Sequence, residues 1–368
     1  MTHARNRPFA ILLAVGLATF SAWPLSGKAD DNDINSPKYQ DAENRYVWTE
    51  RVPFALPEPK ADDAGALHIH RVCIADHQFV AQLTNALVSF DVVRGDGYSE
   101  QFPFQIIDSA CGDKAHRHLL ASSWPDGRVY SIAVKTSDPW AGWRRGDPIK
   151  LLKDEEPLGY VEGEEDVRLL TNRRILVLAG DKLNRAITLS QPIKVFALAR
   201  VAIVRVNDDI YFGNDGGEWG GTLYRIDRTN GKISLVQEGN PVAAIVPDPV
   251  HDGCVLVARA LAHLVTTDGE LMRVCHAASV TLIKNEPVWS VAGKNPIFVA
   301  LSDGIGELQG DAIRNRRKFP SPDHVVAGMH YATLPGIILL SNGITQSVST
   351  SGPVPALIEW HGEAGGAN

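Results

Sequence analysis

One strand pattern returns along most of the chain, and it limits the fold more than any other feature. In each copy, a four- to six-residue apolar strand is followed by a polar or glycine-rich loop, a second strand and a turn. The steps between the first residues of successive copies are 41, 56, 35, 45, 42 and 40 residues. No stretch has the period of a long amphipathic helix. The copies are HQFVAQL from His77, HLLASSW from His118, RILVLAG from Arg174, DIYFGND from Asp209, CVLVARA from Cys254, PIFVALS from Pro296 and GIILLSN from Gly336.

This period predicts an all-β chain and favours a β-propeller. A mean step of about 43 residues matches one four-stranded blade of about 40–50 residues. One blade cannot bury both of its faces, whereas blades stacked around an axis cover one another and leave only short edges. We predict seven blades, with six or eight as alternatives and a pair of β-sandwiches as the competing fold. The last blade should close on an early strand, either RYVWTER from Arg45 or the strand at Leu67.

Turn signals and one acidic stretch separate these strands. Asp-Gly and Asn-Gly pairs, which include Asn230-Gly231 and Asp268-Gly269, are typical of two-residue hairpin turns. The 56-residue step coincides with residues 153–166, KDEEPLGYVEGEED. We interpret this stretch as a solvated surface insertion rather than as an acid–base pair of catalytic carboxylates.

Both ends of the chain are expected to lie outside the propeller. A basic segment with Arg5 and Arg7 precedes a 15-residue apolar run from Phe9 to Trp23, and small residues follow before Asp30. This order is typical of a secretory signal peptide, and the run is shorter than the roughly 20 residues that span a bilayer. We predict a periplasmic or secreted protein without a stable membrane anchor after cleavage. The expected parts are a signal peptide (1–29), an extended polar lead-in (30–63), the propeller (64–362) and a flexible tail (363–368).

Charge and cysteine content narrow the function and the compartment. Beyond the predicted signal peptide, the chain has 33 basic and 43 acidic residues. This balance argues against a nucleic-acid partner, which requires a clustered basic surface. Four cysteines in an exported chain predict disulfide bonds. Three connectivities are open, and proximity in the sequence favours Cys73–Cys111 and Cys254–Cys275.

The segment DIYFGN…GTLYRIDRTNGKI, within residues 209–233, resembles the blade motif of the lactonase, strictosidine-synthase-like and quinoprotein-like propellers. The resemblance covers one blade, and it implies the fold without choosing an activity. Lactonase-type propellers hold a divalent cation on carboxylates and an asparagine at the channel mouth, so a divalent cation is one expectation. No ligand of that set can be matched to a residue here. The tryptophan-docking motifs of quinone-dependent propellers do not repeat from blade to blade, which makes a quinone cofactor improbable.

The loop at residues 213–221 is the main candidate site. It is expected to connect the second and third strands of a blade, and therefore to lie on one rim near the channel. Its candidate ligand-binding residues are Asn214, Asp215, Glu218 and Trp219. Carboxylates can hold a hard cation, and tryptophan can stack on a ligand. The alternative is that Trp219 is a wedge between blades and that the carboxylates are only solvated.

Two further groups of residues are candidates for binding sites. Trp140, Trp143 and Arg144 lie in DPWAGWRRGDP, and exposed aromatic–arginine clusters are typical of protein-interface hot spots. The alternative is a loop that folds over a blade edge. His68 and His70 alternate in LHIHRV, so they point the same way from one strand, as two ligands of a metal ion would. No third ligand can be named.

Two function classes fit these features. One is a binding module that takes a protein, peptide or glycan ligand on the rim. The other is a metal-assisted hydrolase or lyase with its site at the channel mouth. No GxSxG nucleophile motif is present in the sequence, so a binding module is the favoured interpretation, and catalytic residues remain unknown.

The first prediction concerns export. We expect the mature protein to begin at Asp30, after cleavage behind Ala29. Intact-mass spectrometry of protein recovered from the periplasm or medium checks this. Soluble mature protein that retains Met1 would contradict it.

Overall fold

The computed structural model describes the residues that form the sheets and most of their connections. The chain divides into two compact units, Met1–Ser36 and Pro37–Asn368, and every described residue belongs to the second. The described residues are 46–50, 71–75, 78–91, 96–102, 104–110, 116–122, 128–135, 143–161, 167–179, 182–195, 200–263, 266–276, 278–293, 296–318, 324–332, 336–343 and 353–360.

The described strands form seven four-stranded antiparallel sheets. The first three sheets in chain order are β2 (Arg71–Ala75), β3 (Gln78–Gln82), β4 (Ala86–Asp91) and β5 (Asp96–Gln101); β6 (Gln105–Ala110), β7 (His116–Ser122), β8 (Tyr130–Lys135) and β9 (Trp143–Pro148); and β10 (Pro157–Val161), β11 (Val167–Thr171), β12 (Arg174–Ala179) and β13 (Lys182–Thr188).

The next three sheets follow the same order. They are β14 (Arg200–Val206), β15 (Asp209–Asp215), β16 (Gly221–Asp227) and β17 (Ile233–Gly239); β18 (Val242–Pro247), β19 (Cys254–His263), β20 (Thr266–Cys275) and β21 (Ala278–Lys284); and β22 (Val288–Ala292), β23 (Ile297–Leu301), β24 (Gly304–Gln309) and β25 (Ala312–Lys318). The described helical structure is one 3₁₀ turn, η1 (Gly217–Trp219), between β15 and β16.

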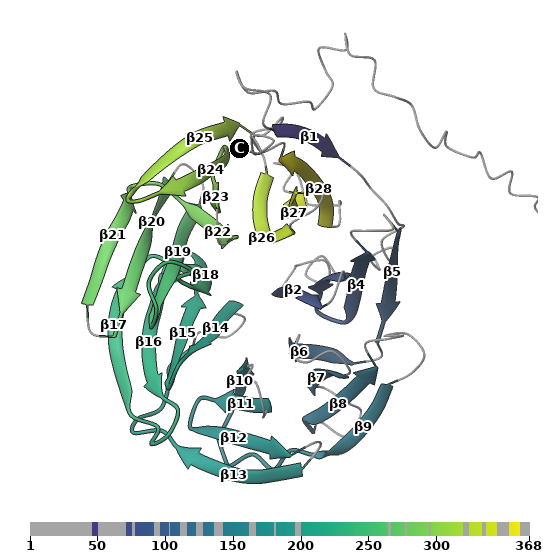
Figure 1. Ribbon diagram of the computed structural model, residues 1–368. Helices are drawn as coiled ribbons and strands as arrows, with labels where there is room; N and C mark the ends of the chain where they lie inside the picture. Colours follow the sequence, from purple (N-terminus) through teal and green to yellow (C-terminus); the bar gives the residue numbers. More distant parts are fainter. Residues whose placement is uncertain are drawn as a thin grey trace, which may run out of the picture. The chain divides into compact units, whose positions relative to one another are not determined.

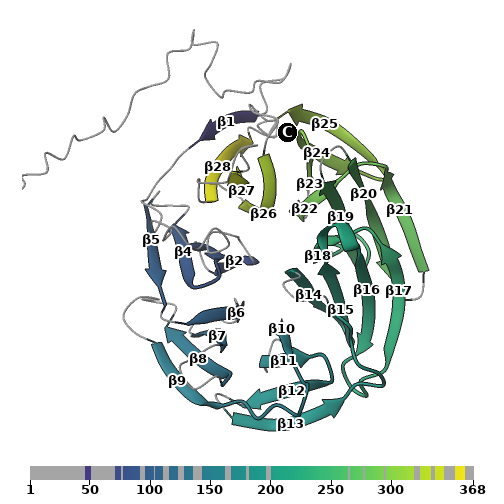
Figure 2. The ribbon, with the colours of Figure 1, turned by 180° about the vertical axis from the view of Figure 1, so that it is seen from behind.

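The remaining sheet is built from both ends of the unit. Its strands are β26 (His324–Ala332), β27 (Gly336–Gly343), β28 (Pro353–Trp360) and β1 (Tyr46–Glu50), in that order from the inside outward. β1 pairs antiparallel with β28 from Tyr46↔Trp360 to Glu50↔Ala356. Of the two early strands that the sequence offered for closure, the one within RYVWTER is therefore confirmed (Figures 1 and 2).

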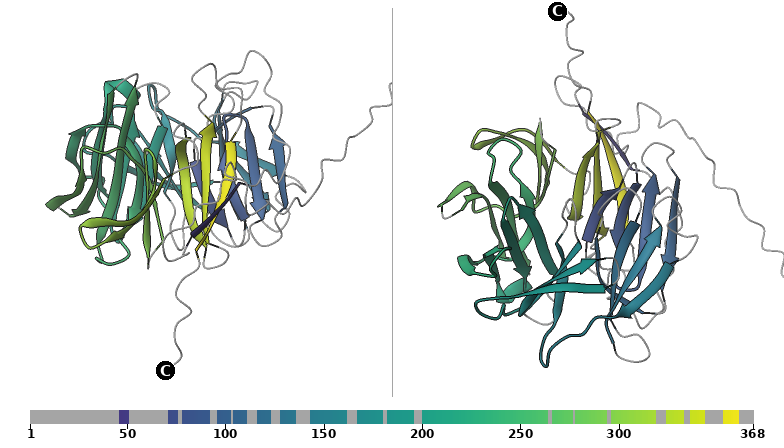
Figure 3. Two further views of the ribbon diagram at one scale, coloured as in Figure 1. Left: turned by 90° about the horizontal axis from the view of Figure 1, so that it is seen from above. Right: turned by 60° about the horizontal axis from the view of Figure 1, so that its bottom comes forward.

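Within the unit Pro37–Asn368, the first strands from β6 to β26 contact one another in sequence, β26 contacts β2, and β3 contacts β6. The sheets therefore follow one another around a ring, with the first strand of each sheet innermost (Figure 1). Side views show the strands running between two rims (Figure 3). The connections between sheets lie on one rim, which we call the connection rim and which includes residues 149–156, 240–241 and 285–287. Because strands alternate in direction, the turns between second and third strands lie on this same rim.

Apolar clusters fill the spaces between neighbouring sheets. One cluster joins Leu158 and Leu170 of the sheet β10–β13 to Phe212 of the sheet β14–β17. Another joins Tyr211 to Val255 and Met272 of the sheet β18–β21. A third joins that sheet to β22–β25. The sheets from β10 to β25 thus bury their facing surfaces against one another, which is the physical reason for the radial arrangement.

Six of the seven repeated apolar segments of the sequence form the second strand of a sheet, and one does not. RILVLAG forms the third strand β12, and the second strand of that sheet is β11. The predicted surface insertion at residues 153–166 is also wrong, because it contains the innermost strand β10, which is mostly buried. Flanking acidic residues hid this short apolar segment in the sequence. The predicted strand ITQSVST, at residues 344–350, lies outside the described residues.

One predicted turn is confirmed and another is wrong. Gly231 adopts φ 75° in the turn after β16, as the Asn-Gly pair predicts. Asp268-Gly269 instead lies inside β20. A Cβ atom at Gly269 would lie 2.6 Å from the Cα atom of Pro287 in the next connection. Glycine is therefore required there by close packing rather than by a turn.

A disulfide joins Cys254 and Cys275 at one end of the β19–β20 pair, so this predicted pairing is confirmed. Cys73 lies in β2, where only the backbone is described, and Cys111 lies outside the described residues. The proposed Cys73–Cys111 bond therefore remains a prediction.

The β1–β28 pairing should be necessary for stability. Deleting residues 30–50 from the mature chain removes β1 and exposes the edge of β28. We expect the free energy of unfolding to fall by about 2–4 kcal/mol, since each backbone hydrogen bond contributes about 0.5–1.5 kcal/mol net. Urea unfolding measures the change. Deleting residues 30–45 alone is the matched control and should change stability by less than about 0.5 kcal/mol; equal effects of the two deletions would contradict the account.

Candidate functional site

The candidate loop runs from the end of β15 through η1 to the start of β16, as the sequence predicts. Its backbone is held by its own hydrogen bonds. Gly216 N donates to Gly220 O at 2.9 Å, Trp219 N to Gly216 O at 3.3 Å, and Gly220 N to Gly217 O at 3.0 Å. The carboxylate of Asp215 accepts from Gly217 N at 2.9 Å. The loop is thus a compact, internally bonded turn on the connection rim.

Asn214 fixes the base of this loop. Its side chain is 1% exposed, and its Oδ1 accepts from Thr222 N at 2.7 Å and from Thr222 Oγ1 at 2.6 Å. These bonds tie the last residues of β15 to the first residues of β16. The Nδ2 atom of Asn214 is buried and has no hydrogen-bond partner among the described residues. Asn214 therefore has a structural role in holding the loop closed.

Trp219 projects away from the packed sheets. Its side chain is 72% exposed, the largest fraction among the large apolar side chains of the described residues. Glu218 beside it is also exposed. The alternative interpretation of Trp219 as a wedge between blades is wrong, because a wedge would be buried. An indole left in solvent forgoes the roughly 25 cal/mol per Å² that burial would contribute.

A buried arginine, Arg259, holds the connection next to which the loop packs. Gly220, with φ 83°, packs so closely on the last residue of β17, next to the connection between β17 and β18, that a Cβ atom would lie 2.6 Å from Gly239 O. On the other side of this connection, Arg259 Nε donates to Asn240 O at 2.8 Å. Arg259 Nη1 also donates to Glu270 Oε1 at 3.0 Å. The foundation of the loop is therefore a hydrogen-bonded and fully buried guanidinium.

Sequence reasoning missed Arg259 as a supporting residue. Arg259 lies in the repeated segment CVLVARA, and its side chain is 0% exposed. Burial lowers the pKa of Arg259 below its ordinary value, while the charge and hydrogen bond of Glu270 and the charge of Asp268 oppose this effect. The signal available in the sequence was an arginine at a position where the strand pattern requires an inward side chain.

Of the other predicted ligand-binding residues, the structure describes the backbone of Trp143 and Arg144. Trp143 and Arg144 are the first residues of the fourth strand β9. This strand starts at the rim opposite the connection rim. The structure describes their backbone only, and Trp140 lies outside the described residues, as do His68 and His70. Because second and fourth strands run in the same direction, the start of β9 and the end of β15 lie on opposite rims. A role of Trp140, Trp143 and Arg144 in ligand binding therefore remains a prediction.

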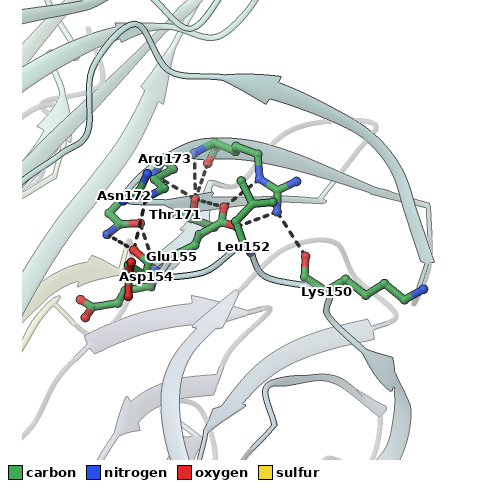
Figure 4. A network of polar contacts seen from close by, with 9 residues as sticks. Lys150, Leu152, Asp154, Glu155, Thr171, Asn172 and Arg173 are labelled. Atoms are coloured by element: carbon green, nitrogen blue, oxygen red, sulfur yellow. Dashed lines mark hydrogen bonds and ion pairs between the residues drawn. The ribbon is translucent and has the colours of Figure 1, made fainter.

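The acidic stretch contains a buried latch, which we define as Glu155, Thr171 and Arg174 (Figure 4). Arg174 donates to both oxygens of Glu155, at 2.9 Å from Nε and 2.6 Å from Nη2. Thr171 Oγ1 donates to Glu155 Oε1 at 2.6 Å, and Leu152 N donates to Oε2 at 2.6 Å. The Glu155 side chain is 0% exposed. Glu155 is therefore neither solvated nor an acid–base catalyst, but a tie between a connection and the following sheet.

Burial raises the pKa of Glu155, but hydrogen bonds from Arg174, Leu152 and Thr171 and the charge of Arg174 outweigh it. The net pKa lies below the ordinary value of 4.5. The carboxylate thus stays ionised at neutral pH, paired with the guanidinium of Arg174, whose pKa is raised by the same hydrogen bond.

Across the described ranges, no group of three or more His, Cys, Asp or Glu side chains is placed to hold a metal ion. Within the same part of the chain, no helix is long and apolar enough to cross a bilayer.

Comparison with known proteins gives the fold and no family. No protein-family model and no curated protein matches the chain. The solved structures that it resembles are β-propellers, so the chain has the β-propeller fold with repeated four-stranded sheets. YCF48 from Cyanidioschyzon merolae is 9% identical, with a TM-score of 0.56 over 87% of this chain and 99% of that chain. A second YCF48 structure, bound to D1 peptide, also gives a TM-score of 0.56 over 90% of this chain and 100% of that chain.

Two other structures show the same likeness. BBS1N in complex with ARL6DN is 13% identical, with a TM-score of 0.51 over 87% of this chain and 99% of that chain. The extracellular domain of a two-component system protein from B. thetaiotaomicron is 14% identical, with a TM-score of 0.50 over 80% of this chain. This chain spans only 38% of that domain's length.

The exposure of Trp219 predicts its effect on stability. Trp219→Ala should change the free energy of unfolding by less than about 0.5 kcal/mol, as surface substitutions usually do. The matched control is Phe212→Ala in the same strand-loop unit. Phe212 is 0% exposed, and its truncation should cost about 3–5 kcal/mol through loss of burial and cavity formation. Chemical denaturation measures both; a loss of several kcal/mol for Trp219→Ala would restore the wedge interpretation.

The lowered pKa of Glu155 predicts acid sensitivity. A carboxyl group with a lowered pKa stabilises the folded state above the ordinary pKa of 4.5, and this contribution is lost as the pH falls through the folded-state value. Glu155→Gln should cost about 3–5 kcal/mol at pH 7 because it leaves Arg174 without its buried partner. Denaturation of both proteins from pH 7 to pH 3 should show the difference shrinking below pH 4.5. A difference that is independent of pH would contradict the latch.

Proposed function

We propose that this chain is an exported, seven-bladed β-propeller that binds a protein or peptide through the loop at residues 213–221. The observation that carries the proposal is the 72% exposure of Trp219 on a loop whose backbone and base are fixed by hydrogen bonds. Exposed tryptophan is enriched in interface hot spots. A rigid loop also loses little conformational entropy when it binds.

Seven four-stranded sheets among the described strands support the blade number. The β1–β28 pairing supports a ring without open edges. The propeller then extends from residue 46 rather than from residue 64, since β1 belongs to its last sheet.

Export is supported by the predicted signal peptide and by the Cys254–Cys275 disulfide. Disulfides persist in oxidising compartments such as the periplasm or the extracellular space. The structural likeness to an extracellular domain agrees with this location.

The partner class is proposed from chemistry and from analogy. An indole beside exposed carboxylate offers an apolar and acceptor-rich surface that suits protein side chains. Two of the similar propellers were solved with a protein or peptide bound, ARL6DN and D1 peptide respectively. A glycan ligand and a metal-assisted hydrolase or lyase remain predictions from the sequence.

The loop can be tested by comparative capture. The mature protein and its Trp219→Ala/Asp215→Asn variant would each be immobilised and exposed to a periplasmic or secreted extract of the source cells. Mass spectrometry should find a partner enriched at least tenfold on the parent protein and lost from the variant, while the melting temperature stays within a few degrees. Equal capture by parent and variant would refute a role for this loop.

A further inference from the structure

The β19–β20 hairpin extends beyond its sheet on the connection rim. Both strands have ten residues, whereas β18 has six and β21 has seven. Pairing with β18 ends at Val242↔Arg259, and pairing with β21 ends at Glu270↔Lys284. The four rungs from Ala260↔Gly269 to His263↔Thr266 therefore form a two-stranded ribbon with no third strand among the described residues.

The register of this ribbon tells which backbone groups point outward. Cys254 and Cys275 face each other at a Cα–Cα distance of 4.2 Å, which is typical of a pair without mutual backbone hydrogen bonds. Such pairs recur at every second rung, so Ala260/Gly269 and Ala262/Thr267 are of the same kind. Residues in these pairs direct both N–H and C=O away from the partner strand.

Two hydrogen bonds agree with this assignment. Ala260 N donates outward to Pro241 O at 3.1 Å, and Gly269 O accepts from Glu286 N at 3.0 Å. The connections on either side thus use the outward groups of the first rung. At the next such rung, Ala262 directs a donor and an acceptor outward along one edge, and Thr267 does so along the other.

Trp219 lies beside this ribbon, because η1 contacts β19. The exposed indole therefore belongs to a 3₁₀ turn that contacts β19 on the connection rim. A free strand edge is a template for another strand, and extended peptides bind to such edges through backbone hydrogen bonds, with a nearby pocket or ring selecting side chains.

We infer that the edge of β19 at Ala262 pairs with an extended segment of a partner protein, one side chain of which stacks on Trp219. This inference rests on the proposed binding function and names its mode. A partner residue opposite Ala262 would accept from Ala262 N and donate to Ala262 O. The neighbouring rim carries exposed Glu218 and Glu238, so a lysine or arginine is the side chain best suited to the indole face.

Proline substitution tests the edge directly, because proline removes an N–H while it is tolerated where that N–H points out of the sheet. Ala262→Pro removes the donor on the β19 edge, which continues the side that β18 covers in the sheet. Thr267→Pro removes the equivalent donor on the opposite edge and is the matched control. Trp219→Ala removes the stacking surface. All three variants should keep the melting temperature of the parent within a few degrees.

The probe is a displayed library of random 12-residue peptides, selected on the parent protein and then measured individually by fluorescence anisotropy. Selected peptides should be rich in lysine or arginine, and their Kd should rise at least tenfold with Ala262→Pro and with Trp219→Ala, but less than twofold with Thr267→Pro. Peptides whose Kd is unchanged by Ala262→Pro would overturn the inference, as would failure of the library to yield any binder. In either case the proposed binding function is judged separately, by whether the captured partner is lost from Trp219→Ala/Asp215→Asn.

Discussion

The pairing of β1 with β28 is the interaction on which the rest of the structure depends. The last sheet takes three strands from the end of the chain and its outermost strand from residues 46–50. Residues more than 300 positions apart in the sequence are thereby held in one hydrogen-bonded ladder. Without that ladder, the sheets would form an open arc whose β28 edge is exposed and prone to pair with other chains. With it, every sheet has two neighbours, and the apolar clusters between sheets can hold one another in place.

On the connection rim of this closed ring, polar contacts hold the connections between sheets. On this rim, an arginine of the following sheet holds the incoming connection in three places. Arg174 binds Glu155, Arg259 binds Asn240 O, and Arg316 pairs with Glu286. These ties fix the connections to the sheets that follow them. The rigid rim that results is a suitable base for the exposed Trp219 and for the projecting β19–β20 ribbon.

The sequence predicts the architecture better than the site. The period of apolar strands is visible because each blade must bury both faces, so β3, β15, β19 and β23 stand out as apolar runs. β10 was missed because only five residues form it and charged residues flank it on both sides. Long-range pairing decides which early strand closes the ring, and this choice depends on the positions of chain ends that no local pattern records.

The candidate site, like the fold, could be predicted from the sequence only in part. Glycines, carboxylates and a tryptophan mark residues 213–221 as an unusual connection, and the topology follows from the strand order. Whether Trp219 is buried or exposed depends on how the loop packs in three dimensions, which no local sequence pattern records. The roles of Glu155 and Arg259 likewise depend on partners 19 residues away along the chain and on complete removal from solvent, neither of which composition reveals.

Hydrogen–deuterium exchange of the mature protein, read by mass spectrometry, tests most directly whether both ends of the chain close one ring. Amides that bridge β1 and β28 open only when the last sheet opens. If β1 and β28 close the ring, peptides covering residues 46–50 and 353–360 exchange slowly and together, at a rate close to that of β27. Exchange of residues 46–50 at the rate of an unstructured peptide, with β27 still protected, would contradict it.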